Sequence, residues 1–323
     1  MDETLTPALS ATRLSASLTR EIEMAQRYLR SQHASATRRA YAADWRIFLA
    51  WCAVRGLQAL PASAETVALF LSAEAEGNQR RPATLARRAA AIRLAHRSQD
   101  CESPTNSELV KATMRGIRRA HGAAPRQKAP ALAVHIRSMV ALTDPATLTG
   151  RRDRALLLLG FAGALRRSEL VGLRVEDLEE TPRGLQLTIR QSKTDQEAVG
   201  ESIAVLRGSE FCPVQAVKLW REAAGVDTGP LFRRVRRGGQ VGATALTPYT
   251  VALIVKKYAA RSGLDPSAFA GHSLRSGFLT SAAMNRASLF KLREISRHKS
   301  LDTLQVYVRR AEAFDDHAGE GLL

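Results

Sequence analysis

The sequence G-H-S-L-R-S-G at residues 271–277 opens the most informative part of the chain. S-R-H-K-S follows at residues 296–300, and L-Q-V-Y-V-R follows at residues 304–309. His272 and Arg275 are three residues apart, so on a helix they would share one face. Tyr307 comes nine residues after His298, on a short predicted helix that Ser300 could cap.

These side chains are the ones a phosphodiester site needs when a phenol is the nucleophile. Arginine presents a fixed fork of donors to phosphate oxygens, histidine exchanges protons near neutral pH, and tyrosine can form a covalent intermediate. Taken singly, His272 could be a buried structural histidine and Tyr307 a tyrosine at the edge of a core. Their order and spacing together favour the site.

The ordered set resembles the catalytic block of the tyrosine recombinases, the phage integrase family. Upstream, G-A-L-R-R-S-E-L at residues 163–170 is similar to the first arginine motif of that family. The resemblance spans roughly residues 16–311. It implies the catalytic residues Arg166, Lys193, His272, Arg275, His298 and Tyr307, with Glu169 orienting the basic groups.

The resemblance also implies what each residue would do. Arg166 and Arg275 would clamp the scissile phosphate, and Tyr307 would attack phosphorus to leave a 3′-phosphotyrosyl link and a free 5′-hydroxyl. Lys193 would protonate the departing oxygen, although a lone lysine in such a loop is usually solvated. His272 would assist proton transfer at the tyrosine, and His298 would bond to the phosphate. No metal or other cofactor is expected, and recombination would require a homo-tetramer on two DNA sites.

Two other functions remain open from the sequence. A type IB topoisomerase uses a similar set of residues as a monomer, and a non-catalytic DNA-binding protein would need only the basic surfaces. Other chemistries find no support: residues 271–277 lack the serine-hydrolase elbow, and the chain has no P-loop and no clustered carboxylates for a two-metal nuclease.

Composition indicates the partner. The formal net charge of +17 points to a polyanion, with nucleic acid ahead of an anionic membrane surface. The three cysteines are far apart and form no C-x-x-C pair, which argues against a zinc site or a disulfide framework and fits a reducing compartment. No apolar run is long enough to span a bilayer. We therefore expect a cytoplasmic, nucleoid-associated protein that binds double-stranded DNA and no membrane.

The expected fold is mainly α, with a small antiparallel β-sheet in the catalytic domain. Tyr41, Trp45, Phe48 and Cys52 recur at helical spacing, whereas residues 185–189 alternate apolar and polar like a half-buried strand. Residues 121–129, H-G-A-A-P-R-Q-K-A, have linker character. The two-domain recombinase architecture would comprise a flexible arm (1–15), a helical, SAM-like core-binding domain (16–122), a linker (123–129), an α+β catalytic domain (130–311) and a tail (312–323).

Basic side chains on both domains are candidate DNA contacts. On the predicted helix at residues 107–120, Lys111, Arg115 and Arg118 lie opposite an apolar stripe, with no carboxylate interleaved among them. A second cluster of arginines precedes Gly238, on a predicted turn. The full set of expected DNA-binding residues is Arg38, Arg39, Arg87, Arg88, Lys111, Arg115, Arg118, Arg234 and Arg237.

Overall fold

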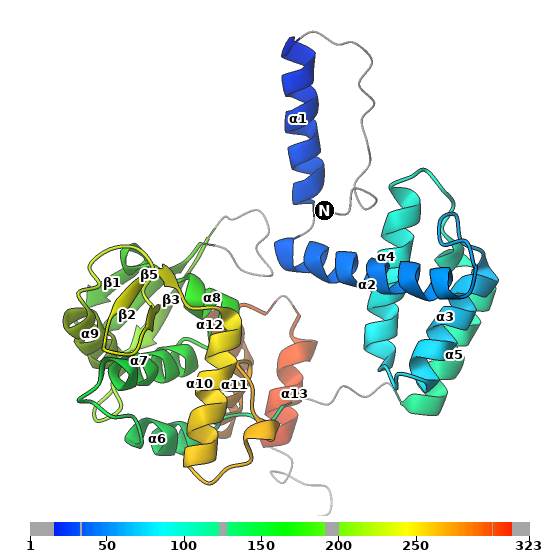
Figure 1. Ribbon diagram of the computed structural model, residues 1–323. Helices are drawn as coiled ribbons and strands as arrows, with labels where there is room; N and C mark the ends of the chain where they lie inside the picture. The colour runs from blue at the N-terminus through cyan, green and yellow to red at the C-terminus, as the bar shows by residue number, and fades with distance from the viewer. Residues whose placement is uncertain (1–15, 33, 123–127, 191–199, 299, 312–323) are drawn as a thin grey trace, which may run out of the picture. The chain divides into compact units, whose positions relative to one another are not determined.

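The computed structural model describes residues 16–32, 34–122, 128–190, 200–298 and 300–311 (Figure 1). The chain divides into two compact units, Met1–Arg126 and Gln127–Leu323, here called the N-terminal and C-terminal units. The division falls inside residues 123–129, the stretch with linker character. The structure is mostly helical with two small antiparallel sheets, which confirms the expected fold class.

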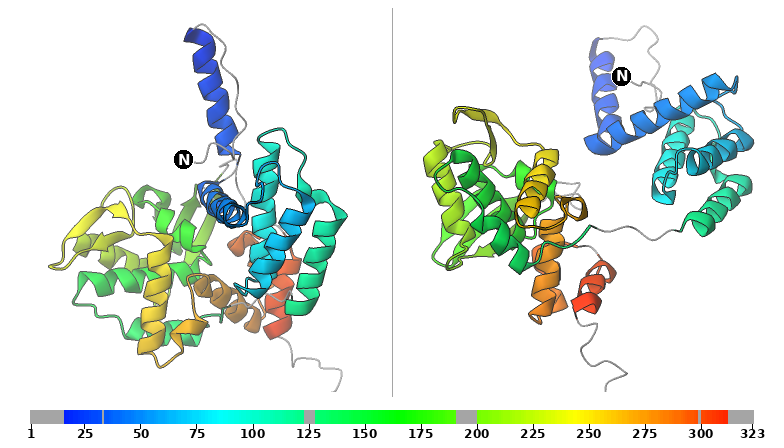
Figure 2. Two further views of the ribbon diagram at one scale, coloured as in Figure 1. Left: turned by 45° about the vertical axis from the view of Figure 1, so that its right-hand side comes forward. Right: turned by 60° about the horizontal axis from the view of Figure 1, so that its bottom comes forward.

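In the described residues of the N-terminal unit all regular elements are helices, and α2 to α5 pack against one another (Figure 2). Trp45, Phe48 and Cys52 of α2 are buried, as their spacing predicts, and the ring of Phe48 meets that of Phe70 edge to face at 5.0 Å. The hydroxyl of Ser107 caps α5 by accepting from the backbone of Val110. The elements are α1 (Ala16–Ser31), α2 (Ser35–Val54), α3 (Ala64–Glu76), α4 (Pro82–Arg97), the 3-10 helix η2 (Pro104–Asn106) and α5 (Glu108–His121).

The C-terminal unit mixes helices with two separate sheets. Strand β2 contains the alternating residues 185–189, as their pattern predicts, and Tyr307 lies on the short helix α13, whereas β1, α9, β4, β5 and α12 are not predicted from the sequence. Its elements are α6 (Ala133–Ala141), α7 (Leu148–Ala162), α8 (Arg167–Gly172), η3 (Val175–Asp177), β1 (Leu178–Thr181), β2 (Gly184–Ile189), β3 (Glu201–Leu206), α9 (Pro213–Ala224), β4 (Arg233–Val235), β5 (Val241–Ala245), α10 (Pro248–Arg261), η4 (Pro266–Ala268), α11 (Ser273–Met284), α12 (Leu289–Ser296) and α13 (Asp302–Ala311).

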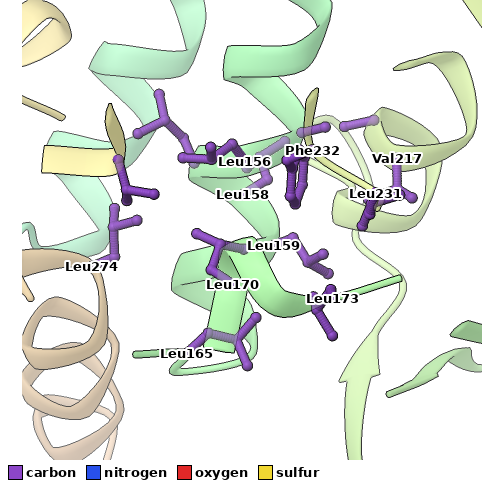
Figure 3. Close-up of a cluster of buried hydrophobic side chains, with 14 of the residues drawn as sticks. Leu156, Leu158, Leu159, Leu165, Leu170, Leu173, Val217, Leu231, Phe232 and Leu274 are labelled. Carbon is purple, nitrogen blue, oxygen red and sulfur yellow. The ribbon is translucent and has the colours of Figure 1, made fainter. Parts of the chain in front are cut away.

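The core of this unit forms around α7, whose residues 155–160 are all buried. Residues 155–160 have no solvent-exposed side, so this part of the helix is apolar all round, whereas the turn before it carries charged residues. The sheet β1-β2-β3 is antiparallel throughout, and Leu185, Leu187 and Ile189 of β2 join the core. Figure 3 shows Leu159 of α7 beside Leu170 of α8. This packing fixes α8, whose first residues belong to the first arginine motif.

A second apolar cluster joins the last three helices. Leu279 and Ala283 of α11, Leu292 of α12, and Leu304 and Tyr307 of α13 form it. Helix α13 therefore lies against α11 through the side of the helix that carries Tyr307. Among the helices that the structure describes, none is long and apolar enough to cross a membrane.

Candidate active site

Arg275 lies at the centre of the site, on α11, with no exposed surface. Its Nη1 donates to the carbonyl oxygen of Ala164 at 2.7 Å, and its Nη2 donates to the carbonyl of Ser296. Burial, followed by the charge of Arg166, lowers the pKa of Arg275 to about 9, so the guanidinium remains protonated at neutral pH. Two like charges held this close in a buried setting favour the arrival of an anion.

The glycine that ends the G-H-S-L-R-S-G sequence explains how α11 comes so close to its neighbours. A Cβ on Gly277 would lie 1.9 Å from the carbonyl oxygen of Ala131, so no other residue fits there without moving the backbone. The backbone N–H of Ala131 also donates to the carbonyl of Ser273, at 2.9 Å. The segment before α6 therefore fixes the position of α11, and with it Arg275.

Arg166 precedes α8 and forms the i,i+3 pair with Glu169 that the sequence suggests. The carboxylate accepts from Nη1 of Arg166 at 2.6 Å and from its backbone N–H at 2.8 Å. Burial raises the pKa of Glu169, but the charges of Arg297 and Arg166 and the backbone hydrogen bond outweigh that effect and lower it below its ordinary value. Glu169 is therefore ionised at neutral pH and orients the Arg166 guanidinium.

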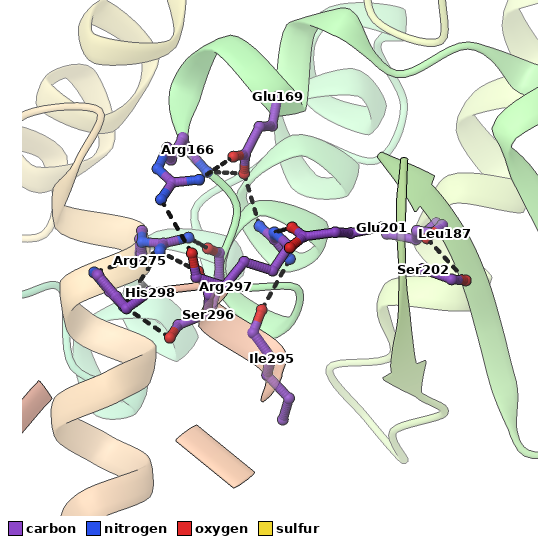
Figure 4. Close-up of polar contacts among 11 residues, drawn as sticks. Arg166, Glu169, Leu187, Glu201, Ser202, Arg275, Ile295, Ser296, Arg297 and His298 are labelled. Atoms are coloured by element: carbon purple, nitrogen blue, oxygen red, sulfur yellow. Dashed lines mark hydrogen bonds and ion pairs between the residues drawn. The ribbon is translucent and has the colours of Figure 1, made fainter. Parts of the chain in front are cut away.

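Arg297, which the sequence analysis does not assign to the site, is the second partner of Glu169. Its Nη2 donates to Oε2 of Glu169 at 2.7 Å, and both side chains are buried (Figure 4). The only signal for it in the sequence is its position next to His298. A contact between residues 128 apart leaves no periodic pattern, so the sequence does not reveal this pair.

His298 follows directly and is half-buried. Its Nδ1 lies 2.8 Å from the hydroxyl of Ser296, and its ring lies 3.3 Å from Nη2 of Arg275. Burial, then the charges of Arg275 and Arg166, lower the pKa of His298 to about 4. The imidazole is therefore neutral at physiological pH.

His272 and Tyr307 complete the set. His272 is exposed and directly precedes α11, and its charge also contributes to the low pKa of His298. Tyr307 is 9% exposed. Its side chain acts to raise the pKa of Arg275, against the lowering that burial causes, so the two groups are close enough to interact electrostatically. The hydroxyl of Ser300 accepts from the backbone N–H of Asp302 at 3.1 Å, at the start of α13.

The structure thus brings Arg166, Glu169, Arg275 and His298 together from three separate parts of the chain, through hydrogen bonds that include the carbonyls of Ser296 and Arg297 (Figure 4). A cavity of about 490 Å³ adjoins them and is lined in part by His298, Arg297 and Phe290. Lys193 lies outside the described residues. In the described part of the chain, no three histidine, cysteine, aspartate or glutamate side chains gather as a metal ion would require.

The candidate DNA contacts divide into two groups. Arg38, Arg39, Lys111, Arg118, Arg234 and Arg237 are exposed, with Arg234 on β4 and Arg237 on the turn that follows. Arg87 is also exposed, although its Nε donates to Asp44 at 2.7 Å.

Two expectations about this surface are wrong. Arg88 is 4% exposed and pairs with Glu74 inside the N-terminal unit, so it stabilises that unit instead of facing DNA. The cationic side of α5 does include a carboxylate, because Glu108 forms an ion pair with Arg115, seven residues further along the helix. Lys111 and Arg118 therefore carry more of the uncompensated charge on that helix than Arg115 does.

Comparison with known proteins decides the family. The model of the phage integrase family matches residues 135–313. An integrase/recombinase XerD homologue from Selenomonas ruminantium is 40% identical over 299 residues, which cover 91% of this chain and 87% of that protein. The chain belongs to the phage integrase family. As a tyrosine recombinase it is a site-specific recombinase, the enzyme class that the sequence resemblance implies.

A second relative and a solved structure are also similar to this chain. A tyrosine recombinase from Synechococcus elongatus is 29% identical, over 93% of this chain and 92% of that protein. In fold, the chain is similar to XerH site-specific recombinase in a pre-cleavage complex with its difH substrate. The TM-score is 0.61 at 16% identity, with 95% of this chain and 91% of that chain covered.

Proposed function

We propose that this recombinase cleaves DNA by attack of Tyr307 on a scissile phosphate held between Arg166 and Arg275. The observation that carries the proposal is the convergence of these two guanidinium groups with a neutral His298, while α13 packs Tyr307 against the helix that bears Arg275. A guanidinium fork matches phosphate oxygens in geometry as well as charge.

Each remaining group has a part in the proposed step. A free phenol has a pKa of about 10 and is a poor nucleophile until a neighbour takes its proton, and in this proposal His272 takes it. The bond from the Tyr307 oxygen to phosphorus forms as the bond to the 5′-oxygen breaks, and Lys193 protonates that oxygen. His298 donates to a phosphate oxygen. Because the phosphotyrosyl bond conserves the energy of the phosphodiester, a 5′-hydroxyl from a second strand can reverse the step.

The substrate we propose is duplex DNA carrying a specific site, bound through cations of both units. The exposed arginines and lysines on α2, α5 and the β4–β5 hairpin would contact phosphates, which gives affinity without sequence information. The proposed assembly is a homo-tetramer on two DNA sites, working in the cytoplasm at the nucleoid.

A two-site recombination assay tests this function. Duplexes selected from a random-sequence pool by binding to the Tyr307→Phe protein would supply the site. A plasmid carrying two copies of that site should give inverted or deleted product with the wild-type protein and none with Tyr307→Phe. The mass of the synaptic complex should correspond to four chains. Relaxation of a plasmid without the site, with no recombinant product, would instead indicate a topoisomerase.

A further inference from the structure

Arg297 occupies a backbone conformation that residues with a Cβ rarely adopt. It ends α12 with φ 57° and ψ 40°, in the left-handed region that favours glycine. Its backbone N–H donates to the carbonyl of Arg293 at 2.8 Å, so the turn is closed by a hydrogen bond. A strained position of this kind persists only where the surrounding contacts determine it, which directs attention to the side chain.

Both terminal nitrogens of the Arg297 side chain are hydrogen-bonded inside the unit, whereas its Nε makes no hydrogen bond. The side chain is 2% exposed, Nη2 donates to Glu169 at 2.7 Å, and Nη1 donates to the carbonyl of Ile295 at 2.8 Å. Its Nε lies 3.7 Å from a carboxylate oxygen of Glu201 on β3. A guanidinium this buried, with both terminal nitrogens hydrogen-bonded inside the unit, is not presented to a DNA phosphate, so Arg297 does not belong with the two arginines of the clamp.

These contacts form a closed ring between α8 and the end of α12. Glu169 accepts from Arg166 and from Arg297, while Nη2 of Arg166 donates back to the carbonyl oxygen of Arg297 at 3.4 Å (Figure 4). The flanking residues are tied as well: Ser296 accepts from Arg275, and His298 bonds to the hydroxyl of Ser296. The position of His298 relative to Arg166 thus depends on Arg297.

We infer that Arg297 is a positioning residue for DNA cleavage, which acts through Glu169 to hold Arg166 and His298 in the geometry that receives the scissile phosphate. This inference rests on the proposed function. The guanidinium groups of Arg166, Arg275 and Arg297 outnumber the carboxylates of Glu169 and Glu201 by one, and Arg297 adds to this positive charge without touching the substrate. That excess suits a phosphoryl group that gains negative charge as Tyr307 attacks.

The inference predicts a pH signature as well as a rate. Glu169 faces Arg166 on its own helix, Arg297 from α12 and Arg275 from α11, and Glu201 from β3 lies on the far side of Arg297. Without Arg297 the buried carboxyl loses its largest positive neighbour, so its pKa rises. A protonated Glu169 no longer orients Arg166 as an ion pair. Cleavage by such a variant should then weaken further as the pH falls.

The experiment measures covalent adduct formation on a nicked duplex of the selected site, as the ratio of variant to wild-type rate. Arg297→Gly keeps the left-handed turn without strain and should be about 10²-fold slower with unchanged DNA binding. The ratio should fall further between about pH 8 and about pH 5.5, and Glu169→Gln should abolish that pH dependence. Lys291→Gln, an exposed position on the same helix that does not line the cavity, is the matched control and should react at the wild-type rate.

A double-mutant cycle decides whether Arg297 acts through Glu169. Arg297→Gly in a Glu169→Gln background should slow the reaction little beyond Glu169→Gln alone. The inference would be overturned if the rate losses of the two single variants multiplied in the double variant, or if Arg297→Gly reacted at the wild-type rate. It would also be overturned if the ratio of variant to wild-type rate did not change with pH.

If thermal unfolding shows that Arg297→Gly is not folded at the assay temperature, Arg297→Lys takes its place. Arg297→Lys should react more slowly than wild type without the pH dependence, and a wild-type rate would refute the inference. Absence of adduct with the wild-type protein would instead refute the proposed function.

Discussion

The guanidinium of Arg275 donates to the carbonyl oxygen of Ala164, 2.7 Å away, and so joins α11 to the turn after α7. Ala164 has φ 45° in that turn, just before the segment that presents Arg166. The same guanidinium also holds the carbonyl of Ser296 at the end of α12. Arg275 is therefore both a proposed phosphate ligand and a structural junction of the site, whereas Arg166 is partly exposed and has fewer structural contacts.

Replacing either arginine should separate these two roles. Arg166→Ala and Arg275→Ala should each slow cleavage by at least about 10²–10³-fold, the usual loss for one electrostatic donor. Arg275→Ala should also lower the free energy of unfolding by about 3 kcal/mol, because two buried carbonyls lose their donor. Denaturant titration and adduct formation measure the two effects. Wild-type activity in Arg166→Lys or Arg275→Lys would contradict the clamp, because an ammonium lacks the fork.

The titration of His298 should affect stability at acid pH. Its folded pKa of about 4 lies below the ordinary 6.5, so the unfolded chain binds the proton first. The contribution of His298 to stability is therefore fully present above about pH 6.5 and is lost as the pH falls towards 4. His298→Asn removes this titration, so the stability gap between pH 7 and pH 4 should narrow relative to wild type in urea unfolding. An equal gap in both proteins would show that the imidazole titrates normally.

A buried network away from the site should affect stability alone. The carboxylate of Asp153 accepts from Arg152 at 2.7 Å, from the hydroxyl of Tyr258 at 3.1 Å and from Lys257 at 3.2 Å. Asp153→Asn leaves buried Arg152 without its counter-charge, which typically costs about 3–5 kcal/mol. We expect a lower melting temperature with an unchanged cleavage rate per folded molecule. A large loss of cleavage in the folded variant would mean that this network reaches the site.

Salt dependence tests the proposed DNA surface. Neutralising about 6–10 phosphates would lower affinity by roughly 10³–10⁵-fold between about 50 and about 200 mM salt. Replacing Lys111, Arg115 and Arg118 with glutamine should flatten that slope and leave thermal stability nearly unchanged, because all three side chains are exposed. Arg183, Arg207 and Lys218, exposed on the C-terminal unit, make a charge-matched control triple. The same slope in both triples would remove α5 from the interface.

The sequence predicts those parts of the site that lie within short segments. His272 and Arg275, His298 and Tyr307, and Arg166 and Glu169 are each legible because a few residues separate the members of each set. The buried pair of Glu169 and Arg297 joins residues 128 apart, and only the packing of α12 beside α8 creates it. Such a contact has no local signature.

Burial of individual side chains is harder to predict for the same reason. Arg87 and Arg88 are neighbours on α4, yet Arg88 alone is buried, because Glu74 of α3 lies opposite it. The alternating strand β2 and the apolar second half of α7 are plain in the sequence. The strand β1, L-E-E-T, has charged residues at its centre, and α12 is only eight residues long, so neither pattern exceeds what a loop would show.

The role of Tyr307 is the central claim, and the other tyrosines in the described structure are poorly placed for it. Tyr258 is buried against Asp153, Tyr28 and Tyr249 are exposed and precede the H-S-L-R motif, and Tyr41 lies on the core-facing helix α2. Only Tyr307 packs beside the helix that carries Arg275.

The most direct measurement is a trapping experiment on a nicked duplex of the selected site, whose short cleaved end diffuses away. In the presence of a chelator and without nucleotide, the wild-type protein should form a DNA adduct that survives denaturation, and proteolysis should leave DNA on the peptide containing Tyr307. Tyr307→Phe, which removes only the phenolic oxygen, should bind the duplex normally and form no adduct. DNA attached to another tyrosine, or cleavage by Tyr307→Phe, would contradict the account.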